Sequence, residues 1–413
     1  MMKLLMIFQT SPYPPDLGPT KRNFPFFLEN IERHEVSVLA FGTPEQERKF
    51  RELYGNRCKH IMFVNNKRPR AINFLFRMWW LFTGRSSYRR FYTRKMERAL
   101  QALLAKERFD LIHCCTTILG YYHLPNDIPL VGDAHNVEYD NVYRAYQQSR
   151  NLILKAYFYW DYLRLKHEEL TITRKFDVVM TTSERDRNIY RQEHPAKPIV
   201  VVPTIVDQAF LQKVDVQEEP KTMIFVGLMN YLPNHHGITY FWDEIFPLIL
   251  EREPAARLFI VGAYPPKKLQ RRASDNVIVT GWVDDVRPYF ARAQVFIIPL
   301  LIGGGIRGKA LEAMAMRRPI VSTTLGCEGI NLKHEESALF ADTPQEFADA
   351  VLRLFNDPAL RRKLTENAFR NVVAGYGKEA GGKALDRVYH SVLKRNGEVR
   401  ALEPTRTGAV TIA

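Results

Sequence analysis

The chain has 413 residues, of which 46% are hydrophobic and 25% are charged, and its formal net charge is +14. This composition excludes a disordered or fibrous protein, and the length favours two domains over one core. The longest nearly apolar stretch, 295–306, contains a proline and three glycines, so the sequence predicts no membrane-spanning helix.

Short apolar runs alternate with amphipathic patterns along the chain. The run at the N-terminus is too short for a signal peptide, so it predicts a first buried strand. A charged break at 213–221 separates two series of predicted strands: 4–8, 36–40, 111–114, 130–132, 178–181 and 199–202, then 222–226, 257–261, 277–280, 295–299, 320–322 and 338–340. Strands separated by helices predict an α/β fold with two doubly wound parallel sheets and a ligand site in the cleft between them.

These series set the expected domain boundaries. We predict an N-terminal domain over 1–212, a linker over 213–221 and a C-terminal domain over 222–375. A last helix over 376–396 is expected to pack back towards the N-terminal domain, before a disordered tail at 397–413. Four cysteines without metal-type spacing are typical of a reducing compartment, so we expect a cytoplasmic protein.

Most of the excess positive charge lies in one segment. From Lys67 to Arg98, arginines alternate with aromatic residues. This pattern favours docking on an anionic membrane surface, at the inner face of the plasma membrane. A core helix with a solvated basic face is an equal alternative, and binding of single-stranded nucleic acid is ranked last because it leaves the glycine motif below unexplained.

The most informative motif follows the predicted strand 295–299. Gly303, Gly304 and Gly305 lead into a helical pattern that begins with Arg307 and Lys309. Glycines allow a backbone to approach an anion, and free N–H groups at a helix start favour phosphate. Cations at that position oppose the helix dipole, and a bound anion resolves the conflict. We therefore predict a diphosphate site without a metal; the alternative is two solvated basic residues on an ordinary connection.

Two further residues refine this interpretation. The motif nearly matches a P-loop, but Ala310 stands where the magnesium-binding Ser or Thr belongs, which argues against an NTPase. Glu312 lies one turn into the helix, where its carboxylate can accept both hydroxyls of a ribose; the alternative is a solvated first-turn glutamate.

Taken together, several segments resemble GT-B glycosyltransferases of family 4 type, over nearly the whole chain. The matching segments are 225–234, 280–286, 312–315, 318–322 and Gly326. The resemblance implies two facing Rossmann-like domains and retaining transfer of a sugar from a nucleoside diphosphate donor to an acceptor hydroxyl. It assigns donor binding to the glycine motif, to Glu312 and to Gly18, Gly227, Asn234, Trp282, Val283 and Gly326.

The sequence departs from the family pattern at two places. Gly304 occupies the position of the first glutamate of the family's Glu-x7-Glu motif, and the loop 227–237 lacks the usual Arg and Lys. Arg307 and Lys309 replace that pair. The chain thus resembles sugar transferases of exopolysaccharide loci, which implies a glycan or lipid-linked acceptor in exopolysaccharide, lipopolysaccharide or other cell-surface glycan synthesis.

In the N-terminal domain, polar residues follow the predicted strand 130–132. His135 matches the family histidine that contacts the transferred sugar, and it joins Arg307 and Lys309 as a predicted catalytic residue. Asp133, Glu138 and Arg22 are predicted to face the acceptor. Two other functions stay open: a GT-B sugar epimerase with the same nucleotide site, and a catalytically inactive scaffold on a membrane surface, which the missing glutamate favours.

Overall fold

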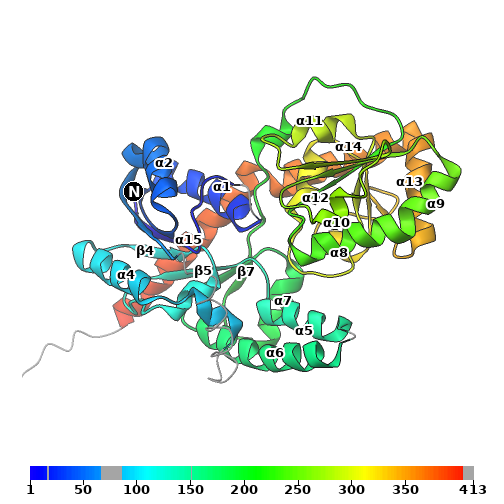
Figure 1. Ribbon diagram of the computed structural model, residues 1–413. Helices are drawn as coiled ribbons and strands as arrows, with labels where there is room; N and C mark the ends of the chain where they lie inside the picture. Colours follow the sequence, from blue (N-terminus) through cyan, green and yellow to red (C-terminus); the bar gives the residue numbers. More distant parts are fainter. Residues whose placement is uncertain (16–17, 67–85, 150, 403–413) are drawn as a thin grey trace, which may run out of the picture.

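The computed structural model describes residues 1–15, 18–66, 86–149 and 151–402, which form two α/β domains (Figure 1). The N-terminal sheet has seven strands in the order β3-β2-β1-β4-β5-β6-β7, and the C-terminal sheet has six in the order β10-β9-β8-β11-β12-β13. Every pairing between these strands is parallel. Because the chain starts each sheet in the middle and then winds outwards on both sides, the doubly wound fold class is confirmed.

The strands are short and match the apolar runs closely. Those of the first sheet are β1 (Lys3–Phe8), β2 (Glu35–Phe41), β3 (Cys58–Val64), β4 (Leu111–Cys114), β5 (Leu130–Ala134), β6 (Val178–Thr181) and β7 (Ile199–Val201). Those of the second are β8 (Thr222–Val226), β9 (Arg257–Val261), β10 (Val277–Gly281), β11 (Val295–Ile298), β12 (Ile320–Ser322) and β13 (Leu339–Phe340).

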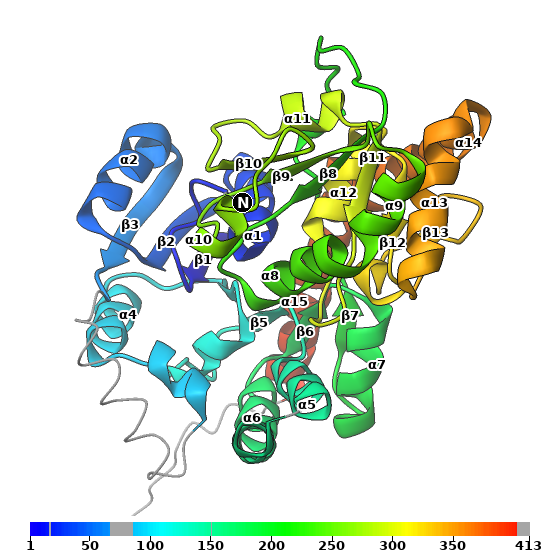
Figure 2. The ribbon, with the colours of Figure 1, turned by 45° about the vertical axis from the view of Figure 1, so that its right-hand side comes forward.

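Helices cover both faces of each sheet (Figures 1 and 2). The N-terminal domain carries α1 (Gly18–Arg33), α2 (Pro44–Tyr54), α4 (Arg94–Lys106), α5 (Glu138–Gln148), α6 (Leu152–Thr173) and α7 (Glu184–Glu193). The C-terminal domain carries α8 (Leu232–Tyr240), α9 (Phe246–Arg252), α10 (Lys267–Gln270), α11 (Arg287–Arg292), α12 (Gly308–Ala315), α13 (Pro344–Asn356) and α14 (Pro358–Tyr376).

Local sequence explains where these elements lie. Every residue of β4, β8 and β11 is buried, as expected for strands covered by helices on both faces. Helices α2 and α13 each start with a capping box, in which a threonine side chain and a Gln or Glu three residues later satisfy free backbone N–H groups.

The edge strand β3 is absent from the predicted series. Among the described residues it pairs with β2 alone, and it is less buried than the central strands: Lys59 is exposed, and Ile61 and Val64 are its buried residues. Its apolar run is short, with four residues at 61–64 after the polar Lys59 and His60, and a run of this length does not distinguish a strand from a helix segment by periodicity alone.

The last helix, α15 (Lys378–Leu402), returns to the N-terminal domain. Leu385, Val388 and Tyr389 are buried in the cluster that contains Leu4 and Met6 of β1. The helix extends beyond residue 396, where we expected it to end, and residues 403–413 of the expected disordered tail lie outside the described residues.

The chain crosses between the domains twice, and the two crossings lie side by side. Between β7 and β8, the Val206 N–H donates to the Tyr376 carbonyl at the end of α14, 2.8 Å away. The carboxyl ends of the two sheets meet across the cleft, where loops after β5 and β11 touch.

In the described ranges, no helix combines the length and the apolar character needed to cross a bilayer.

Candidate active site at the cleft between the sheets

The glycine corner, defined as Gly303, Gly304 and Gly305, connects β11 to α12. The φ angles of Gly303 (114°) and Gly305 (72°) lie in the left-handed region that favours glycine. Helix α12 begins at Gly308, and its N-cap residue Arg307 makes no side-chain capping bond. Among the described residues no side chain caps this helix start, so its N–H groups are suited to an anion.

Lys309 points from this helix start towards the C-terminal sheet. Its Nζ donates to Asn234 Oδ1 on α8 at 2.6 Å and lies 4.3 Å from the centre of the Phe225 ring. Gly227 faces the same amine, since a Cβ at this position would lie 3.0 Å from Lys309 Nζ and 2.6 Å from Asn234 Nδ2. Burial, together with the nearby Arg307 charge, lowers the pKa of Lys309 to about 7.

Arg307 is oriented differently from the prediction. Its guanidinium is turned into its own loop, where it donates to the carbonyls of Gly304 (2.5 Å) and Gly305 and approaches the Leu325 carbonyl at 3.4 Å. Burial lowers the pKa of this guanidinium. Arg307 therefore holds the shape of the glycine corner here, and it would have to turn to contact a diphosphate.

Glu312 lies on α12 with only 6% of its side chain exposed. Its Oε1 forms an ion pair with the Nζ of Lys21, which comes from α1 of the other domain. Its Oε2 is buried and has no hydrogen-bond partner among the described residues. Glu312 thus offers an unsatisfied acceptor at the cleft, as a ribose site requires.

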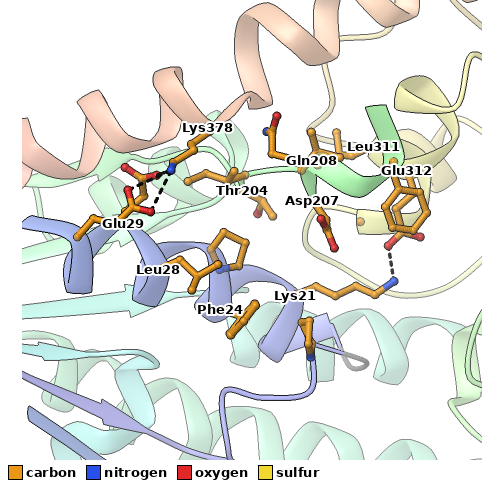
Figure 3. Close-up of a pocket in the computed structure, with 17 residues that line it drawn as sticks. Lys21, Phe24, Leu28, Glu29, Thr204, Asp207, Gln208, Leu311, Glu312 and Lys378 are labelled. Atoms are coloured by element: carbon orange, nitrogen blue, oxygen red, sulfur yellow. Dashed lines mark hydrogen bonds and ion pairs between the residues drawn. The ribbon is translucent and has the colours of Figure 1, made fainter. Parts of the chain in front are cut away.

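A cavity of about 240 Å³ adjoins this carboxylate (Figure 3). Its walls come from α1, from the first interdomain crossing at 204–208 and from the start of α12. Figure 3 shows Lys21 extending from α1 towards Glu312, with Lys378 and Glu29 at the opposite end of the cavity. Of the predicted donor residues, only Glu312 lines this cavity.

Asp133 and Arg22, both predicted to face an acceptor, are buried against each other. The Asp133 side chain is 0% exposed and that of Arg22 is 3% exposed. Arg22 donates to both carboxylate oxygens, through Nε at 2.8 Å and a terminal nitrogen at 2.7 Å. Burial by itself would raise the pKa of Asp133, but the charge and hydrogen bonds of Arg22, together with those of His135, outweigh burial and hold this pKa well below its usual range. Direct contact with an acceptor would require this pair to separate.

His135 lies beside this pair at the end of β5. Its Nε2 is 3.1 Å from Asn23 Oδ1 and 3.5 Å from Asp133 Oδ2. A ring held by one nitrogen keeps a defined orientation, which a catalytic imidazole requires. Asp133 therefore helps to position His135, and His135 in turn stands next to the glycine corner, since a Cβ at Gly305 would lie 3.1 Å from its carbonyl oxygen.

Helix α5 presses one polar face onto the glycine corner. A Cβ at Gly304 would lie 1.9 Å from Asn141 Oδ1, so only glycine fits there beside this side chain. One turn later, Arg144 forms a two-pronged ion pair with Glu328 at 3.0 and 3.1 Å and approaches the Gly303 carbonyl at 3.5 Å. Gln148 donates to the Leu301 carbonyl at 2.9 Å.

The sequence did not single out these α5 residues. Positions 141, 144 and 148 lie on one helix face, and Asn136 makes a similar approach to Gly305 from the preceding loop, 1.9 Å from the position of a Cβ there. A polar stripe of this spacing is the only available sequence signal, and it does not distinguish a solvated face from a face that contacts a second domain.

The remaining predicted donor residues differ in their surroundings. Trp282 is 59% exposed and Val283 packs against the C-terminal core, both after β10 at the carboxyl edge of the second sheet. Gly326 has a packing role, because a Cβ there would lie 2.4 Å from Ser322 Oγ. Gly18 opens α1, and a Cβ there would meet no described atom within 4 Å.

Glu138, the third predicted acceptor residue, starts α5 and accepts a hydrogen bond from the Tyr88 hydroxyl at 2.6 Å. Part of the basic aromatic segment, 67–85, lies outside the described residues. In the described part, Tyr88 packs on the N-terminal core and the Arg89 guanidinium lies 4.9 Å from the Tyr121 ring centre. These two side chains are therefore engaged within the domain.

Comparisons with known proteins agree with this arrangement. Residues 30–210 match the family described as Glycosyltransferase Family 4, and residues 220–357 match Glycosyl transferases group 1. Over 96% of the chain and the whole of each relative, the sequence is 22% identical to an uncharacterized 44.6 kDa protein in the cps region of Klebsiella pneumoniae and 26% identical to an uncharacterized glycosyltransferase of Methanocaldococcus jannaschii. A lipopolysaccharide core mannosyltransferase of Rhizobium leguminosarum is 30% identical over 44% of this chain and 50% of that protein.

Solved structures share the fold. Sucrose-phosphate synthase from Thermosynechococcus elongatus has a TM-score of 0.68 at 16% identity, over 96% of this chain and 100% of that chain. The Anabaena protein HepE in complex with UDP-glucose has a TM-score of 0.63 at 11% identity, over 97% and 100%. The two family matches, one for each domain, and the two facing parallel sheets lead to one conclusion: the chain belongs to the family 4 glycosyltransferases with the GT-B fold.

Proposed function

We propose that this glycosyltransferase takes its sugar from a nucleoside diphosphate donor and transfers it, with retention and without a resident metal, to an acceptor hydroxyl. The observation that carries the proposal is a convergence at the cleft. The glycine corner, an uncapped helix start, the Lys309 amine and the Glu312 carboxylate lie within one loop and one helix turn. Uncapped N–H groups and cations suit a diphosphate, and a buried carboxylate suits ribose hydroxyls.

Each group then has a distinct chemical task. When the bond between the sugar and the diphosphate breaks, negative charge develops on the leaving diphosphate. Lys309, charged beside that anion, and the N–H groups of α12 stabilise this charge in a partly buried site. His135 approaches from the N-terminal domain, held by Asn23 and Asp133, and steadies the sugar and the acceptor as the bond changes.

The acceptor is proposed from the relatives. One lies in a capsule region and another acts in lipopolysaccharide core synthesis, which supports a glycan or lipid-linked acceptor in cell-surface polysaccharide synthesis. The solved relative with UDP-glucose makes UDP-sugars the first donors to test. Docking of the segment from Lys67 to Arg98 on anionic lipid stays part of this proposal.

The test begins with thermal unfolding of the full chain in UDP, GDP and ADP, because a ligand at one hundred times its Kd adds about 2.7 kcal/mol of stability. Sugars on the nucleotide that binds are then incubated with and without glycan acceptors, in buffer with and without EDTA. We expect acceptor-dependent release of the nucleoside diphosphate and a product with the donor's anomeric configuration by NMR. Conversion of the donor without acceptor would favour an epimerase, and no binding of any nucleotide would favour a scaffold.

A further inference from the structure

Lys21 is the residue of the N-terminal domain whose charge reaches the carboxylate of the proposed ribose site. It lies in the first turn of α1, and its ammonium pairs with Glu312 Oε1 across the cleft (Figure 3). The Lys21 side chain is 35% exposed, whereas that of Glu312 is 6% exposed. A flexible, partly exposed lysine side chain therefore pairs with a buried carboxylate whose second oxygen has no partner among the described residues.

The charges around this pair are unbalanced. Arg307, Lys309 and Glu312 lie together at the start of α12, and Lys21 pairs with Glu312 there. Three basic side chains thus accompany one carboxylate at this helix start, and Arg307 is bound to neutral carbonyls rather than to an acid. A doubly charged diphosphate at the start of α12 would supply the missing negative charge.

We propose that Lys21 is an exchangeable cation of the donor site: it neutralises Glu312 until ribose hydroxyls take over that carboxylate, and its ammonium then moves to the diphosphate. This inference rests on the proposed nucleoside diphosphate donor. A lysine suits the exchange because its charge sits on a flexible four-carbon stem. Because Lys21 belongs to the N-terminal domain and the diphosphate would bind to the C-terminal domain, this contact also links the two domains when the donor has both its ribose and its diphosphate.

Loss of the Lys21 charge should affect the affinity for a nucleoside and the affinity for the matching nucleoside diphosphate in different ways. A nucleoside has a ribose but no diphosphate. When its ribose displaces the Lys21 ammonium from Glu312, there is no phosphate with which that ammonium can form a new ion pair. A nucleoside diphosphate recovers this contact at its phosphates. Removing the Lys21 charge should therefore leave nucleoside affinity unchanged or raise it severalfold, while it weakens nucleoside diphosphate binding at least tenfold.

The experiment measures both affinities by calorimetry on the full chain, with UDP and uridine, GDP and guanosine, and ADP and adenosine as paired probes. Lys21→Met removes the charge and keeps the stem, Lys21→Gln is the second uncharged variant, and Lys21→Arg restores the charge. Lys378→Met is the matched control, because Lys378 lies at the far end of the same cavity, where its Nζ contacts Glu29 and Glu32 at 3.2 and 3.1 Å.

We expect Lys21→Met and Lys21→Gln to bind the diphosphate at least tenfold more weakly with no loss of nucleoside affinity, and Lys21→Arg and Lys378→Met to change neither affinity more than twofold. A parallel loss of both affinities, or diphosphate affinity within twofold of the unsubstituted chain, would overturn the proposal. If the unsubstituted chain binds none of the diphosphates, the proposed function fails first, and this inference fails with it.

Discussion

The buried pair of Arg22 and Asp133 allows the sharpest stability prediction. Both side chains are almost fully shielded from water, and the two hydrogen bonds between them are 2.7 and 2.8 Å long. Replacing Arg22 by Met leaves the Asp133 carboxyl buried without its counter-charge. Breaking one side of a buried ion pair costs about 3–5 kcal/mol, whereas replacing both partners by apolar residues is close to neutral.

These energies predict a clear pattern of unfolding. Arg22→Met should lower the melting temperature of the N-terminal domain by about 6–20 °C, since 1 kcal/mol corresponds to about 2–4 °C for a domain of this size. The double variant Arg22→Met, Asp133→Leu should recover most of that loss. Calorimetry and urea titration of the unsubstituted chain, Arg22→Met, Asp133→Leu and the double variant measure the coupling energy between the two residues.

The pH dependence has a defined sign. Because the pKa of Asp133 is held well below its usual range in the folded chain, the pair's contribution is complete above the unfolded pKa of about 4 and is lost as the pH falls through the folded value. The stability gap between the unsubstituted chain and Arg22→Met should therefore narrow below about pH 4. A gap under 1 kcal/mol at pH 7, or a double variant as unstable as the two single losses combined, would refute this reasoning.

Three other predictions concern the cleft. Gly304→Ala places a Cβ against Asn141 Oδ1, so we expect a loss of about 1–3 kcal/mol from overpacking that Asn141→Ala relieves, as measured by urea unfolding; no relief would contradict the contact. The pKa of Lys309 is about 7, and a bound diphosphate favours the charged amine. Calorimetry should therefore show that the affinity for a nucleoside diphosphate falls by up to about tenfold per pH unit above pH 7. Lys309→Arg, which stays charged, should flatten this slope. Arg144→Ala removes the partly exposed pair with Glu328, which joins the two domains, and should cost at most about 1 kcal/mol. Small-angle scattering should report a wider cleft, and an unchanged profile would contradict the expectation that this pair holds the two domains together.

The fold could be predicted because parallel strands covered on both faces produce continuous apolar runs, as in β4 and β11. The edge strand β3 was not among the predicted strands, because its apolar run is confined to the four residues 61–64 after the polar Lys59 and His60. The glycine corner and the start of α12 were also visible, since their chemistry is concentrated within ten residues of sequence.

The contacts between the domains could not be predicted from the sequence. Lys21 meets Glu312, and Asn141 meets Gly304, only after two domains have folded and closed on each other. The orientation of Arg307 was missed for a different reason. A guanidinium can satisfy nearby loop carbonyls as well as an anion, and sequence spacing does not distinguish these two uses.

Lys309→Ala is the decisive variant for binding of a nucleotide sugar's diphosphate at the start of α12. This variant is preferred to Arg307→Ala, which also removes the hydrogen bonds that shape the glycine corner. We expect the initial rate of sugar transfer at saturating acceptor to fall at least tenfold, which is about 1.4 kcal/mol of transition-state stabilisation, with an unchanged melting temperature or a higher one. A folded variant that transfers sugar at the rate of the unsubstituted chain would contradict this expectation.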